Sequence, residues 1–398
     1  MAPTTSSYDV QALRTREFPA LADAIFMNAA SVGPFPRRSL AAVDDFNDRR
    51  VHVRRFGDTD IPDAQARARA AAARLVGGAP AEIALGPNTQ VGLNLAAGFV
   101  LQELQRPGGF EGRRRIVVSE GEFPANVYPW LALERAGATV QLVSTDALGR
   151  PRPDALLAAL AQDDVAVFAL SAVQFATGYR ADLARFGEHC RRRDILFVVD
   201  AIQALGAVPL DVREAHVDIL SSGGQKWLCG PWGSGFTWVR AELIPRLEPL
   251  FPGWLSFTTS LDFNTLVAYG RELLPDARRY EMATVPAQDA IGMAASVELM
   301  LDLGIESIWR HIRAVQQPLL DRAASRDDIV LVSDLAEGRR SGILCFRPPR
   351  VQDVAAALRA AGVICSLREG AIRLSPHFYN TVDEMERVVG IVEETLGR

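Results

Sequence analysis

The sequence predicts an α/β protein in which a mostly parallel sheet is sandwiched by helices and is followed by a smaller C-terminal α+β domain. Two features of the pattern lead to this prediction. Between about residues 114 and 240, short apolar runs rich in β-branched residues alternate with helical patterns, and buried strands separated by helices are typical of a parallel sheet. After about residue 265, long helices lead instead to a few short strands.

The individual elements follow from the same periodicities. A helix is expected over residues 59–78, and the pair Gly77-Gly78 marks its end. The expected strands of the large sheet are 114–120, 138–144, 165–173, 194–200, 216–222 and 233–240, with helices at 153–162 and 181–193. Helices at 286–302, 305–325, 351–362 and 382–396 and strands near 328–333, 342–346 and 371–375 are expected later in the chain. We therefore expect a large domain at 20–265 and a small domain made of 266–398 together with 1–19.

The composition excludes several classes of protein. The 398 residues carry a formal net charge of -5, which gives no basic surface for nucleic acid. The first residues, MAPTTSSYDV, lack a secretory pattern, and no stretch approaches 18 uninterrupted apolar residues, so we expect a cytoplasmic protein without a membrane span. Neither a disulfide framework nor a metal site is expected from five scattered histidines and four cysteines without C-x-x-C spacing, which are Cys190, Cys229, Cys345 and Cys365.

A single lysine stands out among the basic residues. Lysine and arginine total 43, and all of them except Lys226 are arginine. Arginine stays protonated and cannot condense with an aldehyde, whereas the amine of lysine can. Lys226 is therefore a candidate for the residue that holds pyridoxal 5'-phosphate (PLP) as a Schiff base. The alternative is the chance survival of one surface lysine.

Polar residues follow two of the expected strands. Asp200 closes the apolar run LFVVD, and its carboxylate could pair with the protonated pyridine nitrogen of PLP; the alternative is an acid that caps a helix. Gln203 lies one turn further on. The next strand leads through Ser222 and small residues to Lys226, so backbone amides can approach an anion there. Because ligands of open α/β sheets lie at the carboxyl ends of the strands, we expect these residues to meet.

Three further positions have suitable chemistry. Asn88 and Thr89 open a helical run, and helix N-terminal amides with a hydroxyl form a phosphate site, although many helices begin in this way. Phe123 follows another strand and could stack on a flat ring or be an ordinary core aromatic. Arg373 lies inside a short strand and suits the capture of a carboxylate; an interdomain salt bridge is the alternative.

Together, these residues resemble the class V aminotransferase family of PLP enzymes, which includes cysteine desulfurases, selenocysteine lyases, kynureninase and isopenicillin N epimerase. The resemblance spans most of the chain and implies the PLP-dependent transferase fold (fold type I). Its ordered motifs are FMNAASVGP at 26–34, Asn88-Thr89, Glu122-Phe123, Asp200-x-x-Gln203, Gly224-Gln225-Lys226-Trp227 and Arg373-x-Ser375-Pro376-His377.

The resemblance also implies roles for individual residues. Lys226 would form the internal aldimine, Asp200 would pair with the ring nitrogen, and Arg373 would take the substrate carboxylate. Within the segment 278–284, Thr284 would reach the phosphate across the interface of a homodimer with shared sites. The other residues expected at the cofactor are Asn88, Thr89, Phe123, Gln174, Gln203, Ser222 and Gln225, and those expected near the substrate are Asn28 and Ala30.

Departures from the family pattern bear on the reaction. Desulfurases carry histidine where Phe123 stands, commonly also where Gln225 stands, and a nucleophilic cysteine on a loop ahead of the substrate arginine. Here the stretch from Cys365 to Arg373 is too compact for such a loop, so persulfide chemistry is not expected. An aminotransferase acting at the α-carbon of an amino acid is favoured, with a C–S or other β-lyase or an epimerase as alternatives. A PLP-fold binding module is disfavoured because Lys226 and Asp200 are both present.

Overall fold

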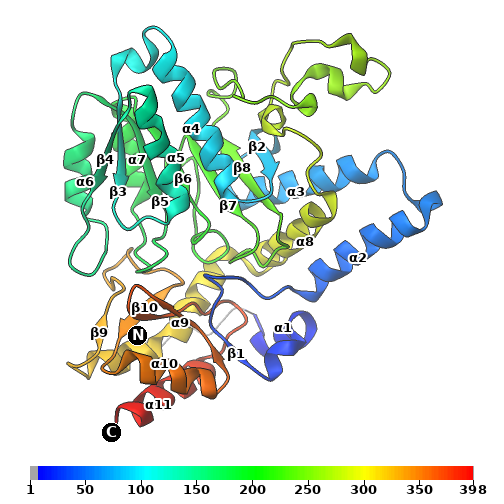
Figure 1. Ribbon diagram of the computed structural model, residues 1–398. Helices are drawn as coiled ribbons and strands as arrows, with labels where there is room; N and C mark the ends of the chain where they lie inside the picture. The colour runs from blue at the N-terminus through cyan, green and yellow to red at the C-terminus, as the bar shows by residue number, and fades with distance from the viewer. Residues whose placement is uncertain (1–7, 398) are drawn as a thin grey trace.

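The computed structural model describes residues 8–397, and the first seven residues, where no secretory pattern is expected, lie outside this range. Its larger part is built on a seven-stranded sheet of order β2-β8-β7-β6-β5-β3-β4 (Figure 1). In this sheet β8 runs antiparallel to both neighbours, and the other pairs are parallel, which confirms the predicted mostly parallel sheet. The strands are β2 (Ile83–Gly86), β3 (Arg115–Ser119), β4 (Thr139–Val143), β5 (Val165–Ser171), β6 (Leu196–Asp200), β7 (Ile219–Gly223) and β8 (Gly235–Val239).

The central strands are apolar on both faces. In β5, Phe168 and Leu170 belong to one hydrophobic core, whereas Val167 and Ala169 belong to another. Because successive side chains of a strand point to opposite faces, these two cores lie on opposite sides of the sheet. Helices therefore cover both faces: α3 (Asp60–Val76), α6 (Pro153–Leu160) and α7 (Leu183–Arg192) on one, and α4 (Thr89–Gln105) and α5 (Tyr128–Ala132) on the other.

The smaller part contains an antiparallel sheet of order β12-β13-β10-β9 with its own core, drawn in orange and red in Figure 1. The helix α8 (Ala287–Leu303) packs on α3 and α2 (Arg37–Val51), and β1 (Ile25–Phe26) pairs with β11 (Val363–Ile364). The predicted division at residue 265 remains a prediction. The other elements here are α9 (Ile305–Ala324), β9 (Val330–Leu331), β10 (Leu344–Arg347), α10 (Val351–Ala360), β12 (Ser366–Arg368), β13 (Ala371–Leu374) and α11 (Val382–Leu396).

Among the elements of the larger part, β2 and α2 were not expected from the sequence. The strand β2 has only four residues, and α2 buries only Ser39 and Phe46, so the periodic apolar pattern that indicates a helix is nearly absent from α2. The helix expected over 59–78 is α3, which ends with Gly77 in the left-handed region at a φ of +73°. Within residues 8–397, no helix is long and apolar enough to cross a membrane.

Candidate active site

The carboxyl ends of three neighbouring strands bring polar residues to one edge of the large sheet. Ser171 at the end of β5 lies opposite Asp200 at the end of β6, and Asp200 lies opposite Ser221 in β7. Just beyond β5, the carbonyl of Phe175 accepts a hydrogen bond of 2.9 Å from Arg373 of β13. This edge therefore faces the small antiparallel sheet, and the space between them is where ligands of α/β sheets bind.

Asp200 is a buried carboxylate, 3% exposed. Its Oδ1 accepts a hydrogen bond from the Ile202 backbone N–H at 3.0 Å, and no hydrogen bond within residues 8–397 reaches Oδ2. Burial raises the pKa of the Asp200 carboxyl, which the Ile202 N–H and the charge of Lys226 partly offset. A buried carboxylate with an open acceptor position fits the protonated pyridine nitrogen of PLP, which supplies a donor and a positive charge.

Lys226 lies half-buried in the turn after β7. Its Nζ is 5.5 Å from the centroid of the Phe123 ring. Burial lowers the pKa of Lys226 to about 8; the charge of Asp200 opposes this shift, and the charges of Arg373 and Arg368 add to it. A lysine with this pKa is largely neutral at mildly alkaline pH, which makes its amine available as a nucleophile. The structure thus places Lys226, Asp200 and Phe123 in one cluster.

The predicted phosphate site lies where α4 begins against the lysine turn. Asn88 caps α4, because its Oδ1 accepts a hydrogen bond from the Val91 N–H at 3.2 Å. The Thr89 Oγ1 accepts one from the Gly223 N–H at 2.8 Å. A Cβ built on Gly235 would lie 2.7 Å from a backbone oxygen of β7 and 3.3 Å from the Asn88 Cα, so glycine is required for this close approach. The N-terminus of α4 therefore lies against the end of β7, three residues before Lys226, and its role as the phosphate site remains a prediction.

Three other predicted cofactor residues belong to the strand ends around the lysine turn, and the side chains of two of them have partners within the protein. Gln203 donates from Nε2 to the Ala30 carbonyl at 3.0 Å and accepts from the Trp227 Nε1 at 2.8 Å. The Ser222 hydroxyl donates to the carbonyl of the next residue at 3.2 Å, and Gln225 is half-buried beside Lys226. Their contacts with the cofactor remain predictions.

A buried carboxylate to which the sequence analysis gave no role, although it belongs to the motif Glu122-Phe123, lies next to this cluster. Glu122 accepts hydrogen bonds from the Ser171 N–H at 2.8 Å, the Gln174 Nε2 at 2.7 Å and the Asn126 Nδ2 at 3.1 Å, and also from the Ser171 hydroxyl. Burial raises the pKa of Glu122 to about 7, with Asp200 adding to the rise and the Ser171 and Asn126 donors opposing it. Glu122 therefore fixes Gln174, a predicted cofactor residue. The sequence signal that could have identified Glu122 is its position as an acidic residue just after the strand expected at 114–120.

Arg373, the predicted substrate anchor, is 2% exposed and lies in β13. It donates to the Phe175 carbonyl and, at 2.7 Å, to the Ser31 Oγ, while its buried Nε has no hydrogen-bond partner. Burial lowers the pKa of Arg373 to about 10, and the charge of Arg368 adds to this. Since no carboxylate within residues 8–397 pairs with Arg373, the alternative of an interdomain salt bridge is not observed.

The remaining predicted residues are divided between the cluster and the surface. Asn28 accepts a hydrogen bond from the Ser366 Oγ at 2.5 Å, and the Ala30 N–H donates to the Ser375 Oγ at 3.1 Å, so both lie close to the strand that carries the arginine anchor. Thr284 is exposed, and no hydrogen bond among the described residues joins it to the cluster.

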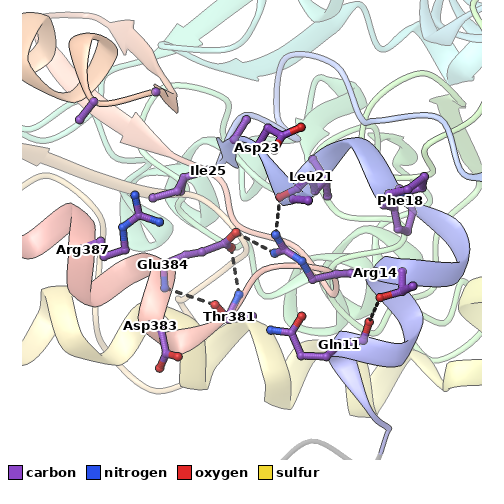
Figure 2. A pocket seen from close by; sticks show the side chains of 16 residues that line it. Gln11, Arg14, Phe18, Leu21, Asp23, Ile25, Thr381, Asp383, Glu384 and Arg387 are labelled. Carbon is purple, nitrogen blue, oxygen red and sulfur yellow. Dashed lines mark hydrogen bonds and ion pairs between the residues drawn. The ribbon is translucent and has the colours of Figure 1, made fainter.

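Two of the cavities among the described residues are relevant to the site, and they lie in different parts of the molecule. One of about 500 Å³ adjoins the cluster and is lined by Glu122, Phe175 and Arg368, among others. Another, of about 510 Å³, lies between α1 (Val10–Glu17) and α11 (Figure 2). There Arg14 of α1 forms an ion pair with Glu384 of α11 at 2.7 Å. This ion pair joins the two helices, so the charged groups in this cavity already have partners within the protein. The cavity beside Glu122 is the one close to the cluster.

Comparisons with known proteins identify the family of the chain and its fold. The family model for "Aminotransferase class-V" matches residues 37–388. The chain is 28% identical over 317 residues to an uncharacterized aminotransferase, YcbU, of Bacillus subtilis, covering 80% of each protein. It is 27% identical over 405 residues to a probable cysteine desulfurase of Methanothermobacter thermautotrophicus, covering 96% of this chain and 97% of the relative. The apo cysteine desulfurase of Thermococcus onnurineus has the same fold, with a TM-score of 0.84 over 99% of both chains at 21% identity, which confirms the predicted fold.

Proposed function

Because the chain belongs to the class-V aminotransferase family and is a PLP-dependent enzyme, as the sequence predicts, we propose that it is an aminotransferase. It would remove the α-amino group of an amino acid and pass it to a keto acid. One observation carries the proposal: the only lysine of the chain is half-buried beside Asp200, with its pKa lowered to about 8. The similarity to YcbU supports the same activity.

The cluster offers a matching group for each part of the cofactor. Lys226 would hold PLP covalently, Asp200 would pair with the ring nitrogen, and Phe123 would lie against the ring. Asn88 and Thr89 would hold the phosphate at the N-terminus of α4. When bound, PLP supplies a conjugated ring that accepts the electron pair released at the substrate α-carbon.

Lys226 and Arg373 divide the remaining work. The Arg373 guanidinium, with its unpaired Nε, binds the α-carboxylate of the substrate and orients the α-carbon. When it is not joined to the cofactor, the Lys226 amine, with its pKa lowered to about 8, would take a proton at Nζ and return it. Asp200, which is buried and accepts one backbone hydrogen bond, would stabilise a positive charge at the ring nitrogen of PLP.

The cysteines do not support persulfide chemistry. Burial raises the pKa of the Cys345 thiol to about 12 and that of Cys365 to about 11. A thiol that stays protonated near neutral pH is a weak nucleophile. Cys365 also lies between β11 and β12 and is not carried on a long loop. These features favour an aminotransferase over a desulfurase.

A cytoplasmic homodimer in which each chain completes its partner's site is part of the proposal. Thr284 is exposed and follows a segment, residues 250–282, that extends from the large sheet in Figure 1. Exposed apolar surface of this extent is typical of protein interfaces. The exposed large apolar residues of this segment are Leu250, Phe251, Trp254, Leu261, Phe263, Val267, Tyr269 and Met282.

The requirement for an acceptor tests the proposal. PLP-loaded protein is incubated with a panel of amino acids without a keto acid, and keto acid and ammonia are measured. We expect about one equivalent of keto acid per site, no ammonia, and renewed turnover after a keto acid is added. Continued release of ammonia and keto acid without an acceptor would identify a β-lyase, and loss of chirality without keto acid would identify an epimerase; either result refutes the aminotransferase.

A further inference from the structure

A tight turn fixes the face on which the side chains of β12 and β13 lie. The strands are joined by Glu369 and Gly370, which both have positive φ, 46° and 76°, as a two-residue hairpin turn requires. This turn sets Arg368 opposite Ala371 and Ser366 opposite Arg373. Because residues two apart in a strand share a face, Arg368 and Arg373 lie on the same face of the small sheet.

The neighbouring strand places a third arginine on that face. In β10, Cys345 lies opposite Arg373, so Arg347, two residues further along, falls beside Ala371. One row across the sheet therefore reads Arg347, Ala371, Arg368, with a small side chain between two arginines. Arg373 lies in the adjacent row, two residues or about 7 Å along the strand.

This face is turned toward the active site. The Cys345 thiol donates to the Ala176 carbonyl of the large part at 3.0 Å, and Arg347, Arg368 and Ala371 line the cavity of about 500 Å³ beside Glu122. Phe175, whose carbonyl accepts the hydrogen bond from Arg373, lines the same cavity as Arg368. The charge of Arg368 also lowers the pKa of both Lys226 and Arg373.

The guanidinium groups of Arg347 and Arg368 are only partly occupied. Arg368 donates to the Leu367 carbonyl at 2.7 Å, and Arg347 donates to the carbonyls of the Glu369-Gly370 turn at 3.3 to 3.4 Å. Within residues 8–397 neither forms an ion pair with a carboxylate, although Glu369 lines the same cavity. Most of their N–H donors are therefore open to a ligand.

We propose that Arg368, assisted by Arg347, forms a second anion-binding position in the active site, which selects substrates with an acidic group at the end of a short side chain. Arg373 takes the α-carboxylate and the Arg347–Arg368 row takes the distal one, so the substrate is a dicarboxylic amino acid, the corresponding keto acid, or both. This specificity rests on the proposed function, because it places the α-carbon of the substrate at Lys226.

Calorimetric titration of the PLP-loaded protein tests this second position without requiring turnover. The probes are succinate, with two carboxylates, and butyrate, of similar length with one. Loss of a charge-assisted hydrogen bond weakens binding by about tenfold or more. We therefore expect succinate to bind about tenfold more tightly than butyrate, and Arg368→Gln to remove this preference without changing butyrate binding. Arg192→Gln, which alters an exposed arginine paired with Glu188 in α7, is the control and should leave both affinities unchanged.

Equal binding of the two probes to the wild type, or an unchanged preference in both Arg368→Gln and Arg347→Gln, would overturn the inference. Half-reactions with aspartate or glutamate and with their keto acids then show which substrate carries the second acid. Failure of the proposed function has a different signature, because the half-reaction would then release ammonia together with keto acid, or lose chirality without keto acid, whatever the affinities of the two probes.

Discussion

The burial of Lys226 affects how readily the protein acquires its cofactor. Only the neutral amine attacks an aldehyde, and burial lowers the pKa of Lys226 to about 8. The rate of PLP uptake by cofactor-free protein should therefore rise with pH, reach half its maximum near pH 8 and level off above about pH 9, with a gain of less than about twofold between pH 8 and 9, as followed by visible absorbance after mixing. An ordinary lysine, with a pKa of about 10.4, would still gain roughly tenfold in rate between pH 8 and 9, and such a rise would contradict the structure.

At the residue scale, the sequence predicted the groups whose chemistry is rare and missed one whose importance comes from its surroundings. Lys226 was identifiable as the only lysine, and Asp200 and Arg373 as charges in apolar runs. The role of Glu122 could not be predicted, because its hydrogen-bond partners Ser171 and Gln174 are 49 and 52 residues away in the sequence. Its burial and the effect of Asp200 on its pKa depend on the packing of β3 against β5.

At the element scale, the packing of α4, the helix at the predicted phosphate site, depends on one glycine. A Cβ on Gly92 would lie 2.1 Å from the Thr237 Oγ1 and 2.3 Å from the Ser221 Oγ, whereas one on Gly98 in the same helix would lie 3.3 Å from Leu250. Gly92→Ala should destabilise the protein by about 1–3 kcal/mol through overpacking and weaken PLP binding. Gly98→Ala, the control, should be within about 1 kcal/mol of the wild type. Equal unfolding midpoints for the two variants in urea would contradict this packing.

The elements that the sequence predicted are those with a strong period. The helix at 59–78 and the buried strands of the large sheet have one, and the structure contains them as α3 and β3 to β8. The antiparallel direction of β8 and the four residues of β2 could not be predicted, since both are set by pairing between distant segments. Of the hairpin, the strand β13 was predicted, but its turn with β12 was not. Glu369 adopts a positive φ in this turn, a conformation that favours glycine or asparagine, so Glu369 itself gives no turn signal.

At the scale of the whole molecule, shared sites predict complementation between two inactive variants. Lys226→Arg removes the amine from one chain, and Thr284→Val removes the hydroxyl that the partner would supply. Each variant alone should lack turnover, but when the two are co-expressed, half of the dimers are mixed and each has one intact site, giving about a quarter of the wild-type activity. Activity no greater than that of the separate variants would show that Thr284 does not act across an interface.

The most direct measurement of the central claim is to locate the bound cofactor in the chain. PLP-loaded protein is reduced with borohydride and cleaved after arginine, and the peptides are weighed. Because the chain has one lysine, the only competing amine is the N-terminus. We predict the added pyridoxyl mass on the peptide 214–240 that contains Lys226; the same mass on the N-terminal peptide, or on none, would contradict the assignment.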